Sequence, residues 1–135
     1  MVWARAAALG LAAAGMTLIG CALPKPPPER GQGAYSGPAV SVGERMGKHT
    51  AVFECPNPGW AAGFDQLRDD PEGWTAVFVT LRRPSPIFVY PQVVTRQEVL
   101  LDVSIQHPVR VFVRVLDHDS IADGAYHLGG EATGK

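Results

Sequence analysis

Cysteine is scarce in this chain: Cys21 and Cys55 are the only two among its 135 residues. A fold stapled by a framework of several disulfides is therefore excluded. Neither sign of charge is in excess, because 12 Lys and Arg residues nearly balance 13 Asp and Glu residues, for a formal net charge of -1. No strong overall field is available to recruit nucleic acid, so nucleic acid is not an expected partner.

The first twenty residues have the composition of a signal peptide. One positive charge lies in Met1–Arg5, and Ala6–Ile19 contains no charged residue. That apolar stretch suits the hydrophobic region of a signal peptide and is short for a bilayer-spanning helix, which needs about 20 apolar residues. It ends in Leu18-Ile19-Gly20-Cys21, which resembles the lipobox of bacterial lipoproteins.

The lipobox resemblance implies that fatty acyl chains such as palmitate are attached at Cys21, that residues 1–20 are removed, and that the product is an exported, membrane-anchored lipoprotein. An ordinary secretory signal and an uncleaved anchor are the alternatives. Ala22, rather than Asp, follows the cysteine, which favours the periplasmic face of the outer membrane if the host is Gram-negative. With Cys21 lipidated, Cys55 is a lone thiol, either buried, which is the common state, or available to a partner's cysteine.

Residues 21–48 are expected to form a tether. Pro24-Lys25-Pro26-Pro27-Pro28 favours an extended polyproline conformation, and five glycines follow before residue 48. Such a sequence combines a stiff part with a flexible part. The remaining length suffices for one domain, which we expect at residues 49–118, followed by a Gly-rich tail at 119–135.

The domain is expected to be all-β. Short stretches of alternating or β-branched residues are separated by Pro and Gly turns, and no sustained 3.6-residue period is present. The stretches lie at 50–54, 60–64, 74–81, 87–90, within 92–105, and at 109–116. They predict a small antiparallel sandwich or open barrel of about five or six strands.

Two of these stretches have informative faces. Residues 74–81 are apolar on both faces, which predicts a central strand covered on both sides. Residues 109–116 place four valines on one face and Arg110 and Arg114 on the other, which predicts a packed valine face and an arginine face in water. Trp60 and Trp74 are expected in the core, with a surface aromatic platform as the alternative.

A cluster of possible metal ligands follows the last predicted strand. Its members are Asp117, His118, Asp119, Asp123 and His127. Carboxylates and imidazoles can hold zinc, but neighbouring side chains of an extended stretch face opposite ways. No nucleophile occurs in a recognisable catalytic context. We therefore predict neither an enzyme nor a bound metal or cofactor, and keep as an alternative a metal-binding domain or envelope enzyme that uses Asp117, His118 and His127.

Five arginines are candidate partner-binding residues. They are Arg82, Arg83, Arg96, Arg110 and Arg114. Arginine is favoured in interfaces for its planar set of donors, and a basic face could meet anionic headgroups or a protein partner. The alternative is a solvated face whose arginines pair with acids such as Glu98 and Asp102.

The middle of the chain carries a second resemblance. Pro58-Gly59-Trp60, Val79–Pro86 and Gln92-Val93-Val94-Thr95 resemble the C-terminal domain of PrcB-like, protease-complex-stabilising bacterial lipoproteins, over about Pro58 to Leu101. The chain departs from that pattern at Arg96-Gln97, where a proline is expected. The resemblance implies an exported β domain that binds and stabilises a partner protein and has no catalytic activity of its own.

These observations together predict a lipid-anchored domain of the cell envelope that binds a protein partner. A structural lipoprotein that merely braces the envelope is a further alternative.

Overall fold

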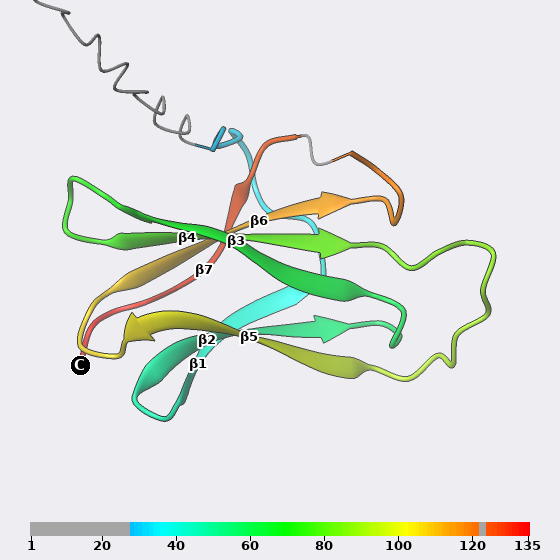
Figure 1. Ribbon diagram of the computed structural model, residues 1–135, viewed down its shortest axis with the longest axis horizontal. Helices are drawn as coiled ribbons and strands as arrows, with labels where there is room; N and C mark the ends of the chain where they lie inside the picture. Colours follow the sequence, from blue (N-terminus) through cyan, green and yellow to red (C-terminus); the bar gives the residue numbers. More distant parts are fainter. Residues whose placement is uncertain (1–27, 122–123) are drawn as a thin grey trace, which may run out of the picture.

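The computed structural model describes residues 28–121 and 124–135, and this part of the chain forms seven strands and no helix (Figure 1). The strands are β1 (Ala39–Arg45), β2 (Lys48–Cys55), β3 (Ala61–Asp69), β4 (Thr75–Arg82), β5 (Thr95–Ser104), β6 (Val109–Leu116) and β7 (His127–Ala132). They pair into a three-stranded sheet of order β1-β2-β5 and a four-stranded sheet of order β3-β4-β6-β7. The predicted all-β class and the small sandwich are confirmed, with seven strands instead of five or six.

Every strand pair is antiparallel apart from β4 and β6, which run parallel. The chain leaves β4, crosses to β5 in the other sheet, and returns to β6 in the first sheet. Two crossings restore the original direction, so β6 lies beside β4 with the same polarity. The connection from β4 to β5 is the long loop that projects at one end of the sandwich (Figure 1).

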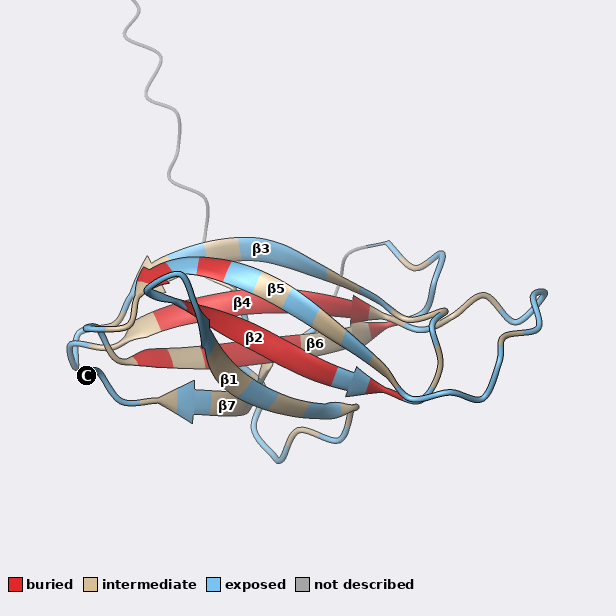
Figure 2. Cartoon of the chain, turned by 90° about the horizontal axis from the view of Figure 1, so that it is seen from below, coloured by how far each residue is buried: buried red, intermediate tan, exposed pale blue. Residues whose placement is uncertain are grey.

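The two inner faces form one core. Val77, Val79 and Leu81 of β4 and the valines of β6 pack against Phe53 of β2 and Leu101 of β5. Every residue from Ala76 to Leu81 is buried, which confirms that β4 is a central strand covered on both sides (Figure 2).

The expected limits of the domain differ from those of the structure. β1 lies inside the range expected to be tether, and β7 lies inside the range expected to be tail. Val40 packs against the core from β1, and a Cβ added at Gly129 of β7 would lie 3.4 Å from Cγ2 of Val40 and 3.0 Å from Cγ2 of Val113. The glycines of β7 therefore permit close packing of backbone on side chain, a role glycine takes inside strands.

The arginine face of β6 does not simply meet water. Phe112 of this face stacks on Phe78 of β4 with ring centroids 5.3 Å apart, and Tyr126 packs edge-on to Phe78 at 5.0 Å. The segment that enters the domain lies over these rings, because the Arg30 guanidinium sits 4.5 Å from the Phe112 centroid. The prediction of a solvated face was wrong because residues distant in sequence cover it.

The same entering segment is hydrogen-bonded to the chain just before β7. The amide of Gly31 donates to the carbonyl of Tyr126 at 2.8 Å, and the amide of Tyr126 donates to the carbonyl of Glu29 at 2.9 Å. Arg30 also pairs with Asp70 at 3.3 Å. The described chain is therefore tied to the sandwich from about residue 29 onward.

Candidate functional site

The five candidate arginines do not form one basic face. Arg110 and Arg114 belong to the outer face of the four-stranded sheet, where Arg110 pairs with Glu72 at 3.1 Å and Glu131 at 3.3 Å. Its guanidinium also lies 4.2 Å from the ring centroid of Trp74. The hydrogen bond that Arg110 donates to the carboxylate of Glu72 raises the pKa of Arg110 above its ordinary value.

Arg114 is held in a polar network. Its Nε donates to the hydroxyl of Thr80 at 2.8 Å, its Nη2 lies 3.8 Å from the carboxylate of Asp65, and its guanidinium lies over the ring of Tyr126. Asp65 in turn accepts hydrogen bonds from Thr80 and from Tyr126. Arg110 and Arg114 therefore join strands to each other, which is a structural use of the charge.

The other three arginines lie at the two ends of the β4–β5 loop. Arg82 donates to the carbonyl of Ser120 at 2.8 Å, and Arg83 pairs with Asp117 at 3.2 Å. Arg96, at the start of β5, lies 3.5 Å from Glu98 of the three-stranded sheet. All three lie at one end of the sandwich, where the side chains of Arg83 and Arg96 are exposed and the guanidinium of Arg82 is bonded to two backbone carbonyls.

The possible metal ligands are dispersed. Asp117 pairs with Arg83, Nδ1 of His118 lies 3.7 Å from Asp119, and the ring of His127 packs against Gly31. Asp123 lies outside the described residues. Across residues 28–121 and 124–135, no group of three His, Cys, Asp or Glu is placed to hold a metal ion.

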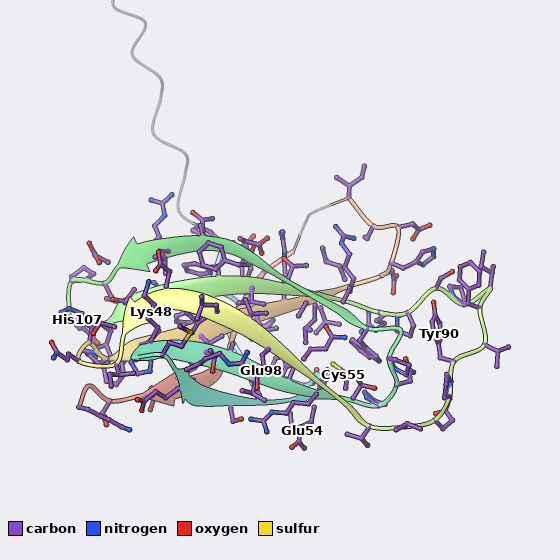
Figure 3. All side chains as sticks on the ribbon, turned by 60° about the horizontal axis from the view of Figure 1, so that its bottom comes forward. Lys48, Glu54, Cys55, Tyr90, Glu98 and His107 are labelled. Atoms are coloured by element: carbon purple, nitrogen blue, oxygen red, sulfur yellow. The ribbon has the colours of Figure 1, made fainter. Side chains whose placement is uncertain are left out.

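The structure describes one of the two cysteines, Cys55. Cys21 lies outside the described residues, so its lipidation stays a prediction. Cys55 is a free, fully buried thiol on the inner face of β2, and Figure 3 shows it inside the sandwich. Burial raises the pKa of this thiol, which disfavours the reactive thiolate form. The buried state expected for Cys55 is confirmed.

The β4–β5 loop exposes a run of apolar side chains. Ile87, Phe88 and Val89 are 80%, 63% and 100% exposed, and we call these three residues the apolar tip. The prediction of a strand at 87–90 was wrong, because residues 83–94 form no strand and 87–90 lie beside no strand of either sheet. A run of β-branched residues resembles a strand in sequence, whether or not another strand lies beside it.

The base of this loop is fixed although its tip is exposed. A Cβ added at Gly59 would lie 2.6 Å from Cβ of Pro84 and 2.8 Å from the ring of Tyr90. The rings of Phe88 and Tyr90 meet edge to face at 6.4 Å. Gly59, in the turn between β2 and β3, thus lets the loop pack closely against the body of the domain.

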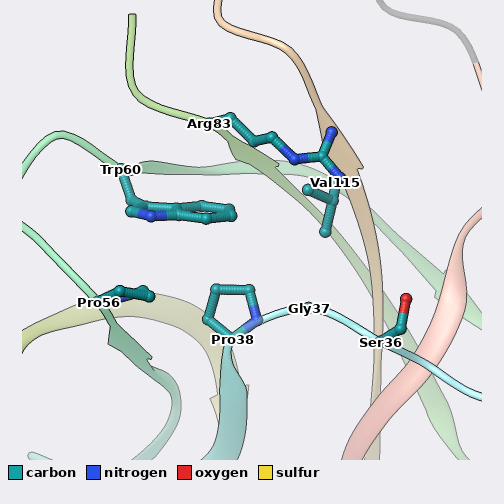
Figure 4. A pocket seen from close by; sticks show the side chains of 7 residues that line it. All are labelled: Ser36, Gly37, Pro38, Pro56, Trp60, Arg83 and Val115. Carbon is teal, nitrogen blue, oxygen red and sulfur yellow. The ribbon is translucent and has the colours of Figure 1, made fainter. Parts of the chain in front are cut away.

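An open hollow lies at the same end of the sandwich. Its volume is about 380 Å³, and it is lined by Ser36, Gly37, Pro38, Pro56, Trp60, Arg83 and Val115. Figure 4 shows the indole of Trp60 facing Pro38 and Pro56, with Arg83 and Val115 beside it. We call this site the Trp60 hollow.

Both the side chain and the backbone of Trp60 are held in place. The indole packs, partly buried, against the core. The side-chain amide of Gln97 donates to the backbone carbonyl of Trp60 and accepts from the backbone amide of Ala62 at 3.1 Å. The expectation of a core position for Trp60 therefore holds only in part, and Trp74 lies beneath Arg110 instead of in the core. The sequence did not single out Pro38 or Pro56, because their meeting depends on the packing of β1 beside β2.

Comparisons with protein-family models, with curated proteins and with solved structures found no match for this chain. Within the part of the chain that the structure describes, no helix has the length and apolarity needed to cross a bilayer.

Proposed function

We propose that this protein is a non-catalytic binding domain, anchored to a membrane of the cell envelope through lipid on Cys21, that holds a protein partner at the Trp60 hollow. The hollow carries the proposal. It offers a concave apolar surface in which an indole and a guanidinium stand side by side. Trp and Arg in such pockets account for much of the affinity of protein interfaces.

The geometry of Arg83 supports a partner with an acidic group. Its side chain is 53% exposed and its ion pair with Asp117 is exposed as well. Exposed ion pairs contribute about 1 kcal/mol or less to stability, so Arg83 can exchange Asp117 for a carboxylate of a partner at little cost.

The linker between the proposed lipid anchor and the folded domain is short. Only residues 22–27 lie between Cys21 and the described chain, and residues 29–31 are already bonded to the sandwich. Fully extended, this stretch spans about 25 Å at most. The domain and its partner would therefore work close to the bilayer surface.

Site-specific photo-crosslinking in native membranes tests the proposal. A photoreactive residue replaces Ser36, which lines the Trp60 hollow and is exposed, and in a matched control it replaces Ser41, which is exposed on β1 away from the hollow. We expect one discrete crosslinked protein from position 36, none from position 41, and loss of the product with Trp60→Ala.

Folding of the Trp60→Ala variant is checked by circular dichroism. Equal products from positions 36 and 41, or a product that survives Trp60→Ala in the folded protein, would contradict a partner site at the hollow. The absence of any product would favour a structural lipoprotein.

A further inference from the structure

The apolar tip has no cover in the described protein. It projects beyond the ends of the strands (Figures 1 and 2), and the side chain of Val89 is fully exposed. Residues 84–95 contain no charged residue. Exposed apolar groups gathered in this way mark a contact with a protein or a membrane.

The shape and chemistry of the tip favour a membrane. The tip is convex, and its three consecutive side chains offer no hydrogen-bonding group, whereas protein interfaces carry about one hydrogen bond per 100–200 Å². A bilayer needs no matching shape and rewards burial of apolar side chains. Tyr90, behind the tip, is of the residue type that gathers at the boundary between lipid and water.

Charged residues flank the loop at both ends. Arg83 precedes it and Arg96 follows it, with side chains 53% and 66% exposed, and each forms an ion pair that lipid phosphates can replace, with Asp117 and with Glu98. Each basic residue near an anionic bilayer contributes about a five-fold gain in affinity. An apolar tip with arginines at its base is complementary to acyl chains beneath anionic headgroups.

The short linker keeps the apolar tip near the bilayer. Because residues 22–27 span about 25 Å at most, a lipid on Cys21 would keep the whole domain within reach of the bilayer. This step rests on the anchoring proposed above.

We propose that the apolar tip enters the anionic bilayer to which the chain is anchored, as a second membrane contact that fixes the orientation of the sandwich. With both the lipid on Cys21 and the apolar tip in the bilayer, the domain cannot rotate freely about its linker. The Trp60 hollow, which shares Arg83 with the base of the loop, is then presented to partners at the membrane surface.

The test places an environment-sensitive fluorophore on the tip. The lipidated protein, purified from membranes, carries Val89→Cys labelled with nitrobenzoxadiazole; Cys55 is fully buried and stays unlabelled. Met46→Cys is the matched control, because Met46 is 94% exposed in the turn between β1 and β2, at the opposite end of the sandwich. Each protein is reconstituted on vesicles of phosphatidylethanolamine and phosphatidylglycerol, or of phosphatidylcholine alone.

We expect the emission from position 89 to shift to shorter wavelength and to be quenched by spin labels on the acyl chains, while position 46 keeps its emission in water. The shift should be larger on vesicles with phosphatidylglycerol, and Arg96→Gln should reduce that difference. Equal shifts on both kinds of vesicle would overturn the preference for anionic lipid.

Flotation with the vesicles separates the two proposals. Protein that floats while position 89 stays in water would overturn the membrane contact, leave the anchor intact, and assign the tip to a protein. Protein that does not float would overturn the anchor and, with it, the second contact.

Discussion

Two apolar regions of this domain lie outside the main core, and they differ in burial. Phe78, Phe112 and Tyr126 form an aromatic cluster on the outer face of the four-stranded sheet, and all three are buried. Ile87, Phe88 and Val89 form the apolar tip, and all three are exposed. Both sets consist of large, largely apolar side chains, so hydrophobicity alone does not explain the difference.

The difference is what lies over each region. Guanidinium groups of Arg30 and Arg114 lie over the aromatic cluster at 4.5 and 4.7 Å from ring centroids. Burial of one such side chain stabilises the fold by about 1.5–3 kcal/mol. Within residues 28–121 and 124–135, no segment lies over the tip. Burial of the tip therefore does not contribute to folding and can stabilise an association.

Phe78→Ala should have the largest effect on stability. Phe78 is 1% exposed and touches both other rings of the cluster, and deletion of such a side chain costs about 3–5 kcal/mol. Equilibrium denaturation in urea measures the loss. A loss of less than about 1 kcal/mol would mean that burial of the aromatic cluster does not stabilise the fold.

Arg30→Ala should have an intermediate effect. It removes a cation–π contact with Phe112 and an exposed pair with Asp70, together worth about 1 kcal/mol. Hydrogen exchange of the Gly31 and Tyr126 amides should accelerate, because their hydrogen bonds, to the carbonyls of Tyr126 and Glu29, hold the same segment. Arg96→Ala, at a more exposed ion pair, is the matched control and should leave these amides unchanged.

Stability should fall in alkali, with Tyr126 contributing. Burial, followed by the hydrogen bond to Asp65, raises the pKa of Tyr126 above its ordinary value of 10.0. A group with a raised pKa in the folded state contributes stability that is complete below the unfolded pKa and is lost as the pH rises toward the folded pKa. The free energy of unfolding should therefore decrease above about pH 10. Tyr126→Phe should show a shallower decrease, and an unchanged slope would contradict this origin.

Val89→Ser should have the smallest effect on stability. Exposed substitutions of this kind change the free energy of unfolding by about 0.5 kcal/mol or less, since Val89 contacts little of the folded chain. The urea midpoint should match that of the unchanged protein. A loss comparable to that of Phe78→Ala would show that the tip is part of the fold and would end the comparison.

The sequence predicted the elements whose faces are unambiguous. The strand predicted at 109–116, with a packed valine face, has the same bounds as β6. The covered strand predicted at 74–81 differs from β4 (Thr75–Arg82) by one residue at each end. It missed β7, whose glycines resemble a loop when read locally. It also placed a strand at 87–90, because apolar residues between prolines carry no information about a missing partner strand.

The candidate site shows the same division. Five arginines could be named in advance, and so could Glu98, which pairs with Arg96 two residues away. The ion pairs of Arg110 and Arg83 could not, because Glu131 lies 21 residues from Arg110 and Asp117 lies 34 residues from Arg83. The Trp60 hollow joins residues from four separate segments. The location of its walls follows from the places where the chain crosses from one sheet to the other.

By itself, the sequence determined the all-β class and the central place of β4, because alternation and two-sided apolarity are local properties of a strand. The tertiary structure alone decided which apolar residues are covered, which arginines remain available, and that β1 and β7 complete the sandwich. These outcomes depend on contacts between segments far apart in the chain, and no local pattern of side chains contains them.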